Sequence, residues 1–238
     1  MRALLLCAGE GTRLRPLTFH MPKVLVPIGG RPLLSYWLEN LSHAKIEKFL
    51  LNTHYLHEQI EAFVESSPYK ERIELAYEGY LLSTGGAAVA NESFFQNEPF
   101  MLVHADNLSF CDFGAFIDSH AARPKGCEIT MMLFRTDTPQ SCGIVELDQS
   151  GVVQAFHEKV QNPPSNLANG AVYICEPSVI EFMRSLGKED VDFSLDVLPH
   201  YMGRINTFLN DVYHRDIGTP LSYAKAQEEI AGLRDILL

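Results

Sequence analysis

The stretch Leu6-Cys7-Ala8-Gly9-Glu10-Gly11-Thr12-Arg13-Leu14-Arg15-Pro16-Leu17-Thr18 decides how this chain folds. It follows directly on an apolar run at 3–7 that is typical of a buried first strand. In an open parallel sheet, ligands bind at the carboxyl ends of the strands, so a glycine-rich loop here lies where a ligand would bind. Gly9 and Gly11 let the backbone approach a phosphate and aim N–H groups at it. The stretch therefore predicts a phosphate-binding loop at the edge of an α/β sheet.

Basic side chains flank this loop at Arg13, Arg15 and Lys23, and they can add charged hydrogen bonds to phosphate oxygens. Two familiar phosphate loops do not match. The dinucleotide-binding fingerprint needs a third glycine where Leu14 stands, and the Walker loop needs a Gly-Lys-Ser/Thr triplet, which the sequence lacks. We interpret the loop as a polyphosphate cradle of another kind. The alternative is a plain glycine turn with basic residues on the surface.

Strand-like and helix-like segments alternate along the first 135 residues. Short apolar or β-branched runs predict strands at 3–7, 49–53, 73–78, 100–105 and 128–135. Helical periodicity predicts helices at 32–41, 56–65, 85–94 and 113–122. This alternation predicts βαβ units, and hence a Rossmann-like α/β fold with a mixed, mainly parallel sheet flanked by helices.

The pattern changes after residue 135, where two strands joined by a tight turn indicate a more antiparallel half. The segments expected there are strands at 143–148, 152–157, 171–175, 205–209 and 212–216, helices at 178–186 and 193–201, and a last helix from Pro220. Thr219 and Pro220 suit the N-cap and first position of that helix. We expect one domain over 1–238, made of two halves at 1–135 and 136–238.

The composition is that of an ordinary globular protein, with 46% hydrophobic and 21% charged residues. Because 19 Lys and Arg stand against 30 Asp and Glu, the net charge is −11, which argues against a nucleic-acid partner. The five cysteines are odd in number and scattered, which predicts reduced thiols and a cytoplasmic location. No apolar run approaches the roughly 20 residues that span a bilayer, so no membrane association is expected.

The segment 8–33 resembles the signature of the sugar-1-phosphate nucleotidyltransferases, also called NDP-sugar pyrophosphorylases. That signature is Ala/Gly-Gly-x-Gly-Thr-Arg-Leu-x-Pro-Leu-Thr, then Pro-Lys, then Pro-x-x-x-x-Pro-Leu, and the chain matches it at fixed spacing. The resemblance continues at 82–87, 105–107, 158–159, 169–170 and 216–219, and so covers nearly the whole chain. It implies a GT-A-like nucleotidyltransferase fold. It also implies a reaction in which an NTP and a sugar 1-phosphate give an NDP-sugar and pyrophosphate.

Such a transfer depends on charge neutralisation and alignment more than on a nucleophile, which favours cations and a metal ion. The resemblance implies catalytic roles for Arg13, Lys23 and Asp106. It implies nucleotide binding by Ala8, Gly9, Gly11, Thr12, Arg13, Glu78, Thr84 and Gly85. In the second half, it implies sugar-phosphate binding by Gly143, Glu158, Lys159 and Asn169. Asp106 and Asp216 end predicted strands and match the family's two metal ligands, so we expect them to hold Mg²⁺.

The residues leave two pairs of substrates open. A carboxylate at Glu78 can accept from guanine N1–H and N2–H together, which favours GTP, with mannose or heptose 1-phosphate as the acceptor. It can also accept from the single N3–H of uracil, so a UTP-dependent enzyme acting on N-acetylmuramate 1-phosphate is the alternative. Two positions depart from the family pattern, because Ala105 precedes Asp106 where glycine is usual and Cys142 stands where tyrosine is frequent.

A catalytically silent module that binds a nucleotide and regulates a partner is the alternative of another class. The presence of Arg13, Lys23, Asp106 and Asp216 argues against it. Many relatives carry a C-terminal left-handed β-helix, but no hexapeptide repeats follow residue 216, so we expect a catalytic domain without one. The expected partners are the two small-molecule substrates, and the sequence leaves the oligomeric state open, including a homodimer.

Overall fold

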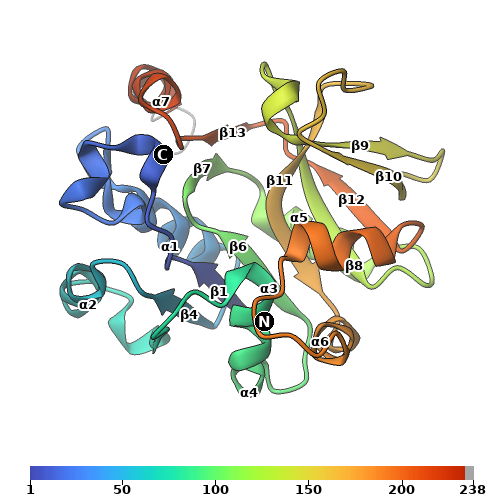
Figure 1. The fold of residues 1–238 in the computed structure, drawn as a ribbon, viewed down its shortest axis with the longest axis horizontal. Coiled ribbons are helices and arrows are strands. Elements are labelled where there is room, and N and C mark those ends of the chain that lie inside the picture. Colours follow the sequence, from blue (N-terminus) through green and yellow to red (C-terminus); the bar gives the residue numbers. More distant parts are fainter. Residues whose placement is uncertain (234–238) are drawn as a thin grey trace.

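The computed structural model describes residues 1–233, which form a central sheet with helices packed on both of its faces (Figure 1). The strands of this sheet are β1 (Arg2–Leu6), β4 (Lys48–Thr53), β5 (Ile73–Tyr77), β6 (Phe100–His104), β8 (Ile129–Arg135), β9 (Gly143–Leu147), β10 (Val153–Glu158), β11 (Leu167–Cys175) and β12 (Ile205–Leu209). Their order is β10-β9-β11-β6-β1-β4-β5, and β8 pairs with both β11 and β12. The strands β6, β1, β4 and β5 run parallel, whereas β11 is antiparallel to its neighbours β6, β8 and β9. The predicted mixed, mainly parallel sheet is therefore confirmed.

Two small ribbons stand beside the main sheet. One pairs β2 (Pro27–Ile28) with β3 (Arg31–Pro32), and the other pairs β7 (Asn107–Phe110) with β13 (Tyr213–Asp216). The helices are α1 (Leu33–His43), α2 (His57–Glu65), α3 (Ser83–Ala90), α4 (Glu92–Phe95), α5 (Phe113–Ala121), α6 (Pro177–Ser185) and α7 (Pro220–Leu233). Residues 234–238, where the predicted last helix would continue, lie outside the described part of the chain. None of the described helices is long and apolar enough to cross a membrane.

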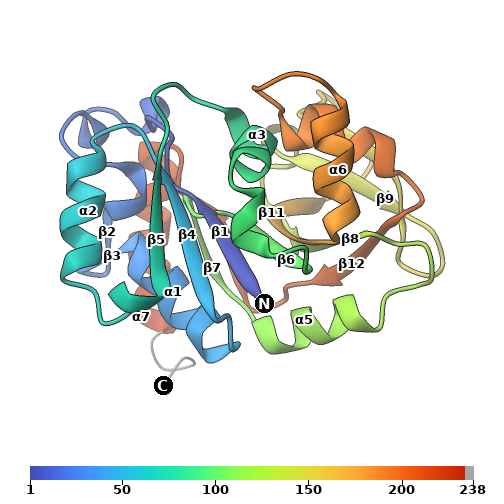
Figure 2. The same cartoon turned by 90° about the horizontal axis from the view of Figure 1, so that it is seen from below.

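The alternation of side chains along the buried strands divides the core into two layers. On β1, Leu4 belongs to the layer under α3, α4 and α6, while the next residue, Leu5, belongs to the layer under α1, α2 and α5. Both leucines are fully buried, as expected for a strand covered on both faces. Figure 2 shows the two sets of helices on opposite faces of the strands. With both faces covered, the carboxyl ends of the parallel strands are the place where a ligand is expected to reach the sheet.

Two predicted helices differ from the structure. The helix expected at 85–94 is broken into α3 and α4 at Asn91, whose side-chain amide donates to Ala87 O and competes with the helical backbone. The helix expected at 193–201 is a π-helical turn, Phe193–Val197, followed by a 3-10 turn, Leu198–Tyr201. Pro199 lacks the N–H group that a continuous helix would use there.

His120 lies in the buried contact between α5 and β8, and only 3% of its surface is exposed. Its Nε2 lies 3.1 Å from Glu176 Oε1 and its Nδ1 lies 2.7 Å from Thr130 Oγ1. Since a carboxylate only accepts, Nε2 carries the proton and Nδ1 accepts from the threonine. Burial, reinforced by the charge of Arg123, lowers the pKa of His120 to about 4. The folded protein therefore keeps this imidazole neutral in mild acid.

Acidification from pH 7 to pH 5 should lower the free energy of unfolding by about 1–2 kcal/mol through His120, because the unfolded imidazole takes up a proton that the folded one refuses. The stability that His120 contributes is thus present above pH 6.5 and is lost as the pH falls toward 4. Urea unfolding of the wild type and of His120→Gln at both pH values measures this. The variant should lose less stability than the wild type, and equal losses would contradict the assignment.

Candidate active site

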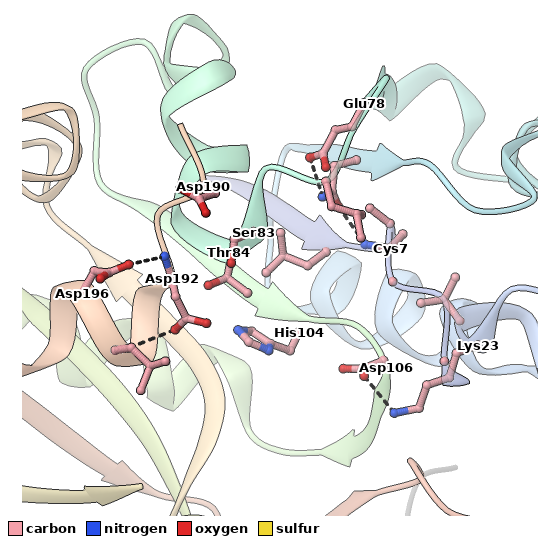
Figure 3. Close-up of a pocket in the computed structure, with 18 of the residues that line it drawn as sticks. Cys7, Lys23, Glu78, Ser83, Thr84, His104, Asp106, Asp190, Asp192 and Asp196 are labelled. Carbon is pink, nitrogen blue, oxygen red and sulfur yellow. Dashed lines mark hydrogen bonds and ion pairs between the residues drawn. The ribbon is translucent and has the colours of Figure 1, made fainter. Parts of the chain in front are cut away.

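A cavity of about 630 Å³ opens at the carboxyl edge of the parallel strands (Figure 3). Its walls are the loop after β1, the ends of β4, β5 and β6, the first turn of α3 and the segment 188–196. The predicted site residues that line it are Ala8, Gly9, Gly11, Lys23, Glu78, Thr84 and Asp106. The position matches the general rule for ligand sites in open α/β sheets.

Lys23 lies at the centre of the charged part of this site. The side chain is nearly buried, with 5% exposed, and its Nζ lies 2.8 Å from Asp106 Oδ2 and 3.3 Å from Asp216 Oδ1. Arg13 approaches the same group, with its Nη2 3.7 Å from Asp216 Oδ2. The structure therefore brings together four charged residues from three distant segments of the sequence.

The ribbon of β7 and β13 fixes the two carboxylates relative to each other. Asp216 is the last residue of β13 and pairs with Asn107, the residue that follows Asp106. The backbone N–H of Gly218 donates to Asp216 Oδ1 at 2.8 Å and so holds that carboxylate in one orientation. A Cβ atom at 218 would lie 2.7 Å from Arg13 Nη2, so glycine leaves the room that Arg13 occupies.

The local charges keep Asp106 ionised. Partial removal from water opposes ionisation, but the Lys23 ammonium outweighs this effect and holds the pKa of Asp106 below its usual value. Burial likewise disfavours the charged form of the neighbouring His104 and lowers the pKa of its imidazole. A carboxylate that stays ionised is suited to bind cations.

The chemistry of the two carboxylates fits a magnesium ion. Asp106 and Asp216 keep 40% and 45% of their side chains exposed, and Lys23 already lies within hydrogen-bonding distance of both. Mg²⁺ is usually bound by one or two carboxylates together with substrate phosphates and water. Within residues 1–233, no cluster of three or more His, Cys, Asp or Glu side chains forms a candidate all-protein metal cage. Asp106 and Asp216 are accordingly the residues that would hold the ion.

Glu78 directly follows β5 and lines the cavity at the end of that strand, where two hydrogen bonds hold its carboxylate. Its Oε1 accepts from Asn52 Nδ2 at 2.9 Å and its Oε2 accepts from the backbone N–H of Leu82 at 3.2 Å. Asn52 is oriented in turn, because its Oδ1 accepts from the backbone N–H of Cys7 at 2.8 Å. Each carboxylate oxygen of Glu78 retains a further lone pair for a ligand.

The segment 188–196 forms a wall of the cavity that the sequence did not predict. Its backbone joins α3, because the amides of Gly85 and Gly86 donate to Val191 O and the Phe193 N–H donates to Thr84 Oγ1. Gly85 is thus buried against Val191 and does not line the cavity. The sequence does carry one signal, since Asp192 caps the following turn by accepting from two backbone N–H groups, but a cap does not reveal where the turn packs.

The residues expected to bind the sugar phosphate gather at the ends of the antiparallel strands. Gly143 pairs with Glu158 across β9 and β10, and Lys159 Nζ lies 2.9 Å from Glu158 Oε1. The amide of Asn169 is engaged within β11, donating to Tyr173 Oη at 2.6 Å and accepting from the Ala171 N–H. These residues lie outside the set that lines the cavity, as do Thr12, Arg13 and Asp216. Their roles toward a substrate stay predictions.

Several residues that line the cavity belong to no motif in the sequence, namely Asn52, His104, Lys188, Asp190 and Asp196. Arg15, which the sequence placed among the candidate phosphate-binding residues, lies outside the cavity lining, and its Nη2 is 3.3 Å from Glu10 Oε2. Strand alternation places Asn52 and His104 at the ends of β4 and β6, but only the sheet order shows that these ends meet at one cavity.

The fold and the site define a class of α/β proteins that present a glycine-rich phosphate loop and two strand-end carboxylates at one sheet edge. The sequence model of the family described as nucleotidyl transferase matches residues 2–232. The chain therefore belongs to the nucleotidyl transferase family, which agrees with the resemblance found in the sequence.

Individual relatives support this membership. The mannose-1-phosphate guanylyltransferase of Mycobacterium tuberculosis is 32% identical over 233 residues, covering 96% of this chain and 64% of the relative. The D-glycero-alpha-D-manno-heptose 1-phosphate guanylyltransferase of Aneurinibacillus thermoaerophilus is 31% identical, covering 97% and 98%. The chain spans 60% to 64% of the length of several of the curated relatives that it matches.

Solved structures show the same fold. A putative glucose-1-phosphate thymidylyltransferase from Bacillus anthracis superimposes with a TM-score of 0.86 at 19% identity, covering 96% of this chain and 94% of that one. HddC from Yersinia pseudotuberculosis superimposes with a TM-score of 0.81 at 25% identity, covering 96% and 99%, and its structure has also been solved in complex with GMP-PN. The GT-A-like nucleotidyltransferase fold expected from the sequence is confirmed.

Replacing Gly86 by alanine should disturb the wall of the cavity. A Cβ atom at 86 would lie 2.1 Å from the backbone oxygen of Glu189, so the segment 188–196 must move away from α3. We expect the free energy of unfolding to fall by about 1–3 kcal/mol, as for other overpacked sites. Urea unfolding measures the change.

Gly79→Ala is the matched control for this variant. A Cβ atom at 79 meets nothing within 4 Å, and the residue lies in the loop that follows Glu78. Its effect on stability should stay within about 0.5 kcal/mol. Equal effects of the two substitutions would contradict the contact between α3 and the segment.

Proposed function

We propose that this protein transfers a guanylyl group from GTP to mannose 1-phosphate or heptose 1-phosphate and releases pyrophosphate. The observation that carries the proposal is the cluster of Lys23, Asp106 and Asp216 at the phosphate-binding loop. It offers cationic and metal-binding groups at one point of the cavity, as an in-line transfer between phosphates requires. A protein that only binds a nucleotide has no need of this arrangement.

The residues of the loop serve the triphosphate. Gly9 and Gly11 line the cavity without side chains, so their backbone can approach the phosphates closely. Lys23 supplies its ammonium at the phosphorus under attack, where negative charge develops in the transition state. Arg13 keeps 65% of its side chain exposed beside Asp216 and is free to reach the departing pyrophosphate. A Mg²⁺ ion held by Asp106 and Asp216 would neutralise charge on the phosphate oxygens.

The acceptor side of the site is formed by Gly143, Glu158 and Lys159. In our proposal, Lys159 binds the phosphate of the sugar 1-phosphate and Glu158 accepts hydrogen bonds from sugar hydroxyls. A Cβ atom at 143 would lie 2.7 Å from Glu158 Oε2, so glycine at this position leaves space beside the carboxylate. Asn169 is assigned a supporting contact with the sugar.

Two observations support guanine as the base. Glu78 is fixed by Asn52 and Leu82 and still offers lone pairs that match the N1–H and N2–H groups of guanine. In addition, relatives such as those from M. tuberculosis and A. thermoaerophilus are named as guanylyltransferases of mannose or heptose 1-phosphate. UTP with N-acetylmuramate 1-phosphate is the second candidate, since Glu78 also suits the N3–H of uracil. The five free cysteines support a reducing, cytoplasmic setting.

Pyrophosphate release in the presence of Mg²⁺ tests the proposal directly. GTP, UTP and two further NTPs are each combined with the 1-phosphates of mannose, heptose, N-acetylmuramate and glucose. We expect the highest kcat/KM with GTP and mannose or heptose 1-phosphate, because Glu78 pairs with two guanine donors. Turnover with UTP alone would replace the proposed base, and no turnover with any pair would refute the enzymatic function.

Asp106→Asn should abolish most of the turnover without unfolding the protein. The amide removes the negative charge that pairs with Lys23 and binds the metal, so we expect kcat to fall by at least about 100-fold. Asp118→Asn, an exposed position on α5, is the matched control. Thermal unfolding checks the fold of both variants. Retained activity with an unchanged dependence on Mg²⁺ would remove Asp106 from the metal site.

A further inference from the structure

His104 is the residue of the cavity that neither the family resemblance nor the proposed function assigns. It is the last residue of β6 and stands two residues before Asp106. In Figure 3 its ring extends from the end of that strand into the space between Asp106 and Asp192. A polar ring thus enters the cavity between the phosphate-binding groups and the segment 188–196.

The Nε2 atom of His104 is buried and has no hydrogen-bond partner among residues 1–233. Two other buried side-chain atoms in this part of the chain share that property, Thr53 Oγ1 and His214 Nδ1, but neither residue lines the cavity. An unpaired buried polar atom costs about 1–3 kcal/mol, so native proteins rarely leave one unexplained. Because His104 lines a ligand cavity, a bound substrate is the partner that explains its free nitrogen.

The position of His104 indicates which substrate that is. In the sheet, β6 lies between β1, which leads into the phosphate loop, and β11, which leads toward the expected sugar-binding residues. The His104 ring packs edge-on against Tyr173 of β11 at a centroid distance of 6.3 Å, and Tyr173 Oη accepts from Asn169. The loop and Glu78 lie on the other side of β6, at β1 and β5. His104 therefore lies on the acceptor side of the nucleotide.

The chemistry of the imidazole narrows the choice of partner group. A ring nitrogen of histidine either donates or accepts a hydrogen bond, and a hydroxyl group can pair with it in both cases. A phosphate only accepts, and Lys23, Arg13 and Lys159 already supply cations for it. The charged groups that act on His104 are Asp106, Asp192, Lys23 and Glu158. The last of these is the carboxylate that we assign to sugar hydroxyls.

We propose that Nε2 of His104 hydrogen-bonds one ring hydroxyl of the acceptor sugar, which makes His104 a specificity-determining residue of this enzyme. The inference rests on the proposed function, because it takes a sugar 1-phosphate as the acceptor. A sugar that lacks this hydroxyl leaves Nε2 buried and unpaired, as in the protein without substrate. The enzyme would then reject sugars without this hydroxyl, because they cannot form the hydrogen bond to Nε2. A lost hydrogen bond to a buried polar group discriminates between substrates more strongly than a missing methylene group does.

Steady-state kinetics of His104→Phe test this contact. Phenylalanine keeps an aromatic ring at the position and removes both nitrogens. We expect kcat/KM for the sugar 1-phosphate to fall roughly 10- to 100-fold, the equivalent of one lost buried hydrogen bond. The KM for GTP should stay unchanged. His104→Gln, which keeps a hydrogen-bonding group, should recover part of the loss, and His43→Phe, at the exposed end of α1, is the control.

Monodeoxy analogues of the sugar 1-phosphate identify the hydroxyl. With the wild type, kcat/KM for one analogue should be roughly 10- to 100-fold lower than for the parent sugar 1-phosphate. With His104→Phe, kcat/KM for that analogue and for the parent sugar 1-phosphate should be equal. Thermal unfolding confirms that the variants are folded. A raised KM for GTP, or equal losses for every analogue in both proteins, would overturn the assignment. An active wild type with an unaffected His104→Phe refutes the contact alone, whereas a wild type inactive with every NTP and sugar pair refutes the proposed function as well.

Discussion

The contact of one buried ammonium with two carboxylates organises this protein. Lys23 Nζ joins Asp106, which follows β6, to Asp216, which ends β13. Burying an unpaired cation costs several kcal/mol, and the two carboxylates that reach the ammonium offset this cost. The arrangement in turn requires the β7–β13 ribbon, which sets the register of Asp216 against Asn107. The site that we propose for phosphates and metal therefore depends on three segments from opposite ends of the chain.

The cavity shows how an acidic protein can present a site for acidic substrates. The net charge is −11, yet Lys23 and Arg13 lie together at the glycine-rich loop. The segment 188–196 brings carboxylates to the opposite wall, where Asp192 caps a helical turn and Asp196 Oδ2 lies 2.5 Å from Lys188 Nζ. These carboxylates are occupied by the protein's own donors. The ion pairs and hydrogen bonds around the cavity therefore determine the local charge of the site, whereas the net charge of the protein describes its remaining surface.

Local sequence patterns predicted the elements that depend on interactions between residues close in the sequence. The apolar runs of β1, β4 and β6 mark strands that are covered on both faces, and these strands form where expected. The helix predicted at 85–94 is interrupted at Asn91, because the side chain of this residue competes with the backbone for a hydrogen bond. The spacing of apolar residues, from which the helix was predicted, does not reveal this competition. Of the two strands in the β7–β13 ribbon, the sequence predicted β13 but not β7. The strand β7, Asn107–Phe110, follows a tight turn after β6 and pairs with a strand far along the chain.

The sequence by itself determined the strand–helix alternation, the glycine-rich loop and the identity of Arg13, Lys23, Asp106 and Asp216 as charged residues at loop or strand ends. These features are local, because side-chain period and turn chemistry act over a few residues. Only the tertiary structure decided that Lys23 contacts both carboxylates, that the segment 188–196 forms a wall of the cavity, and that His104 lines this cavity with a buried Nε2 that has no partner among residues 1–233. Such contacts join residues that are distant in the chain. They follow from strand order and sheet packing, which no local pattern encodes.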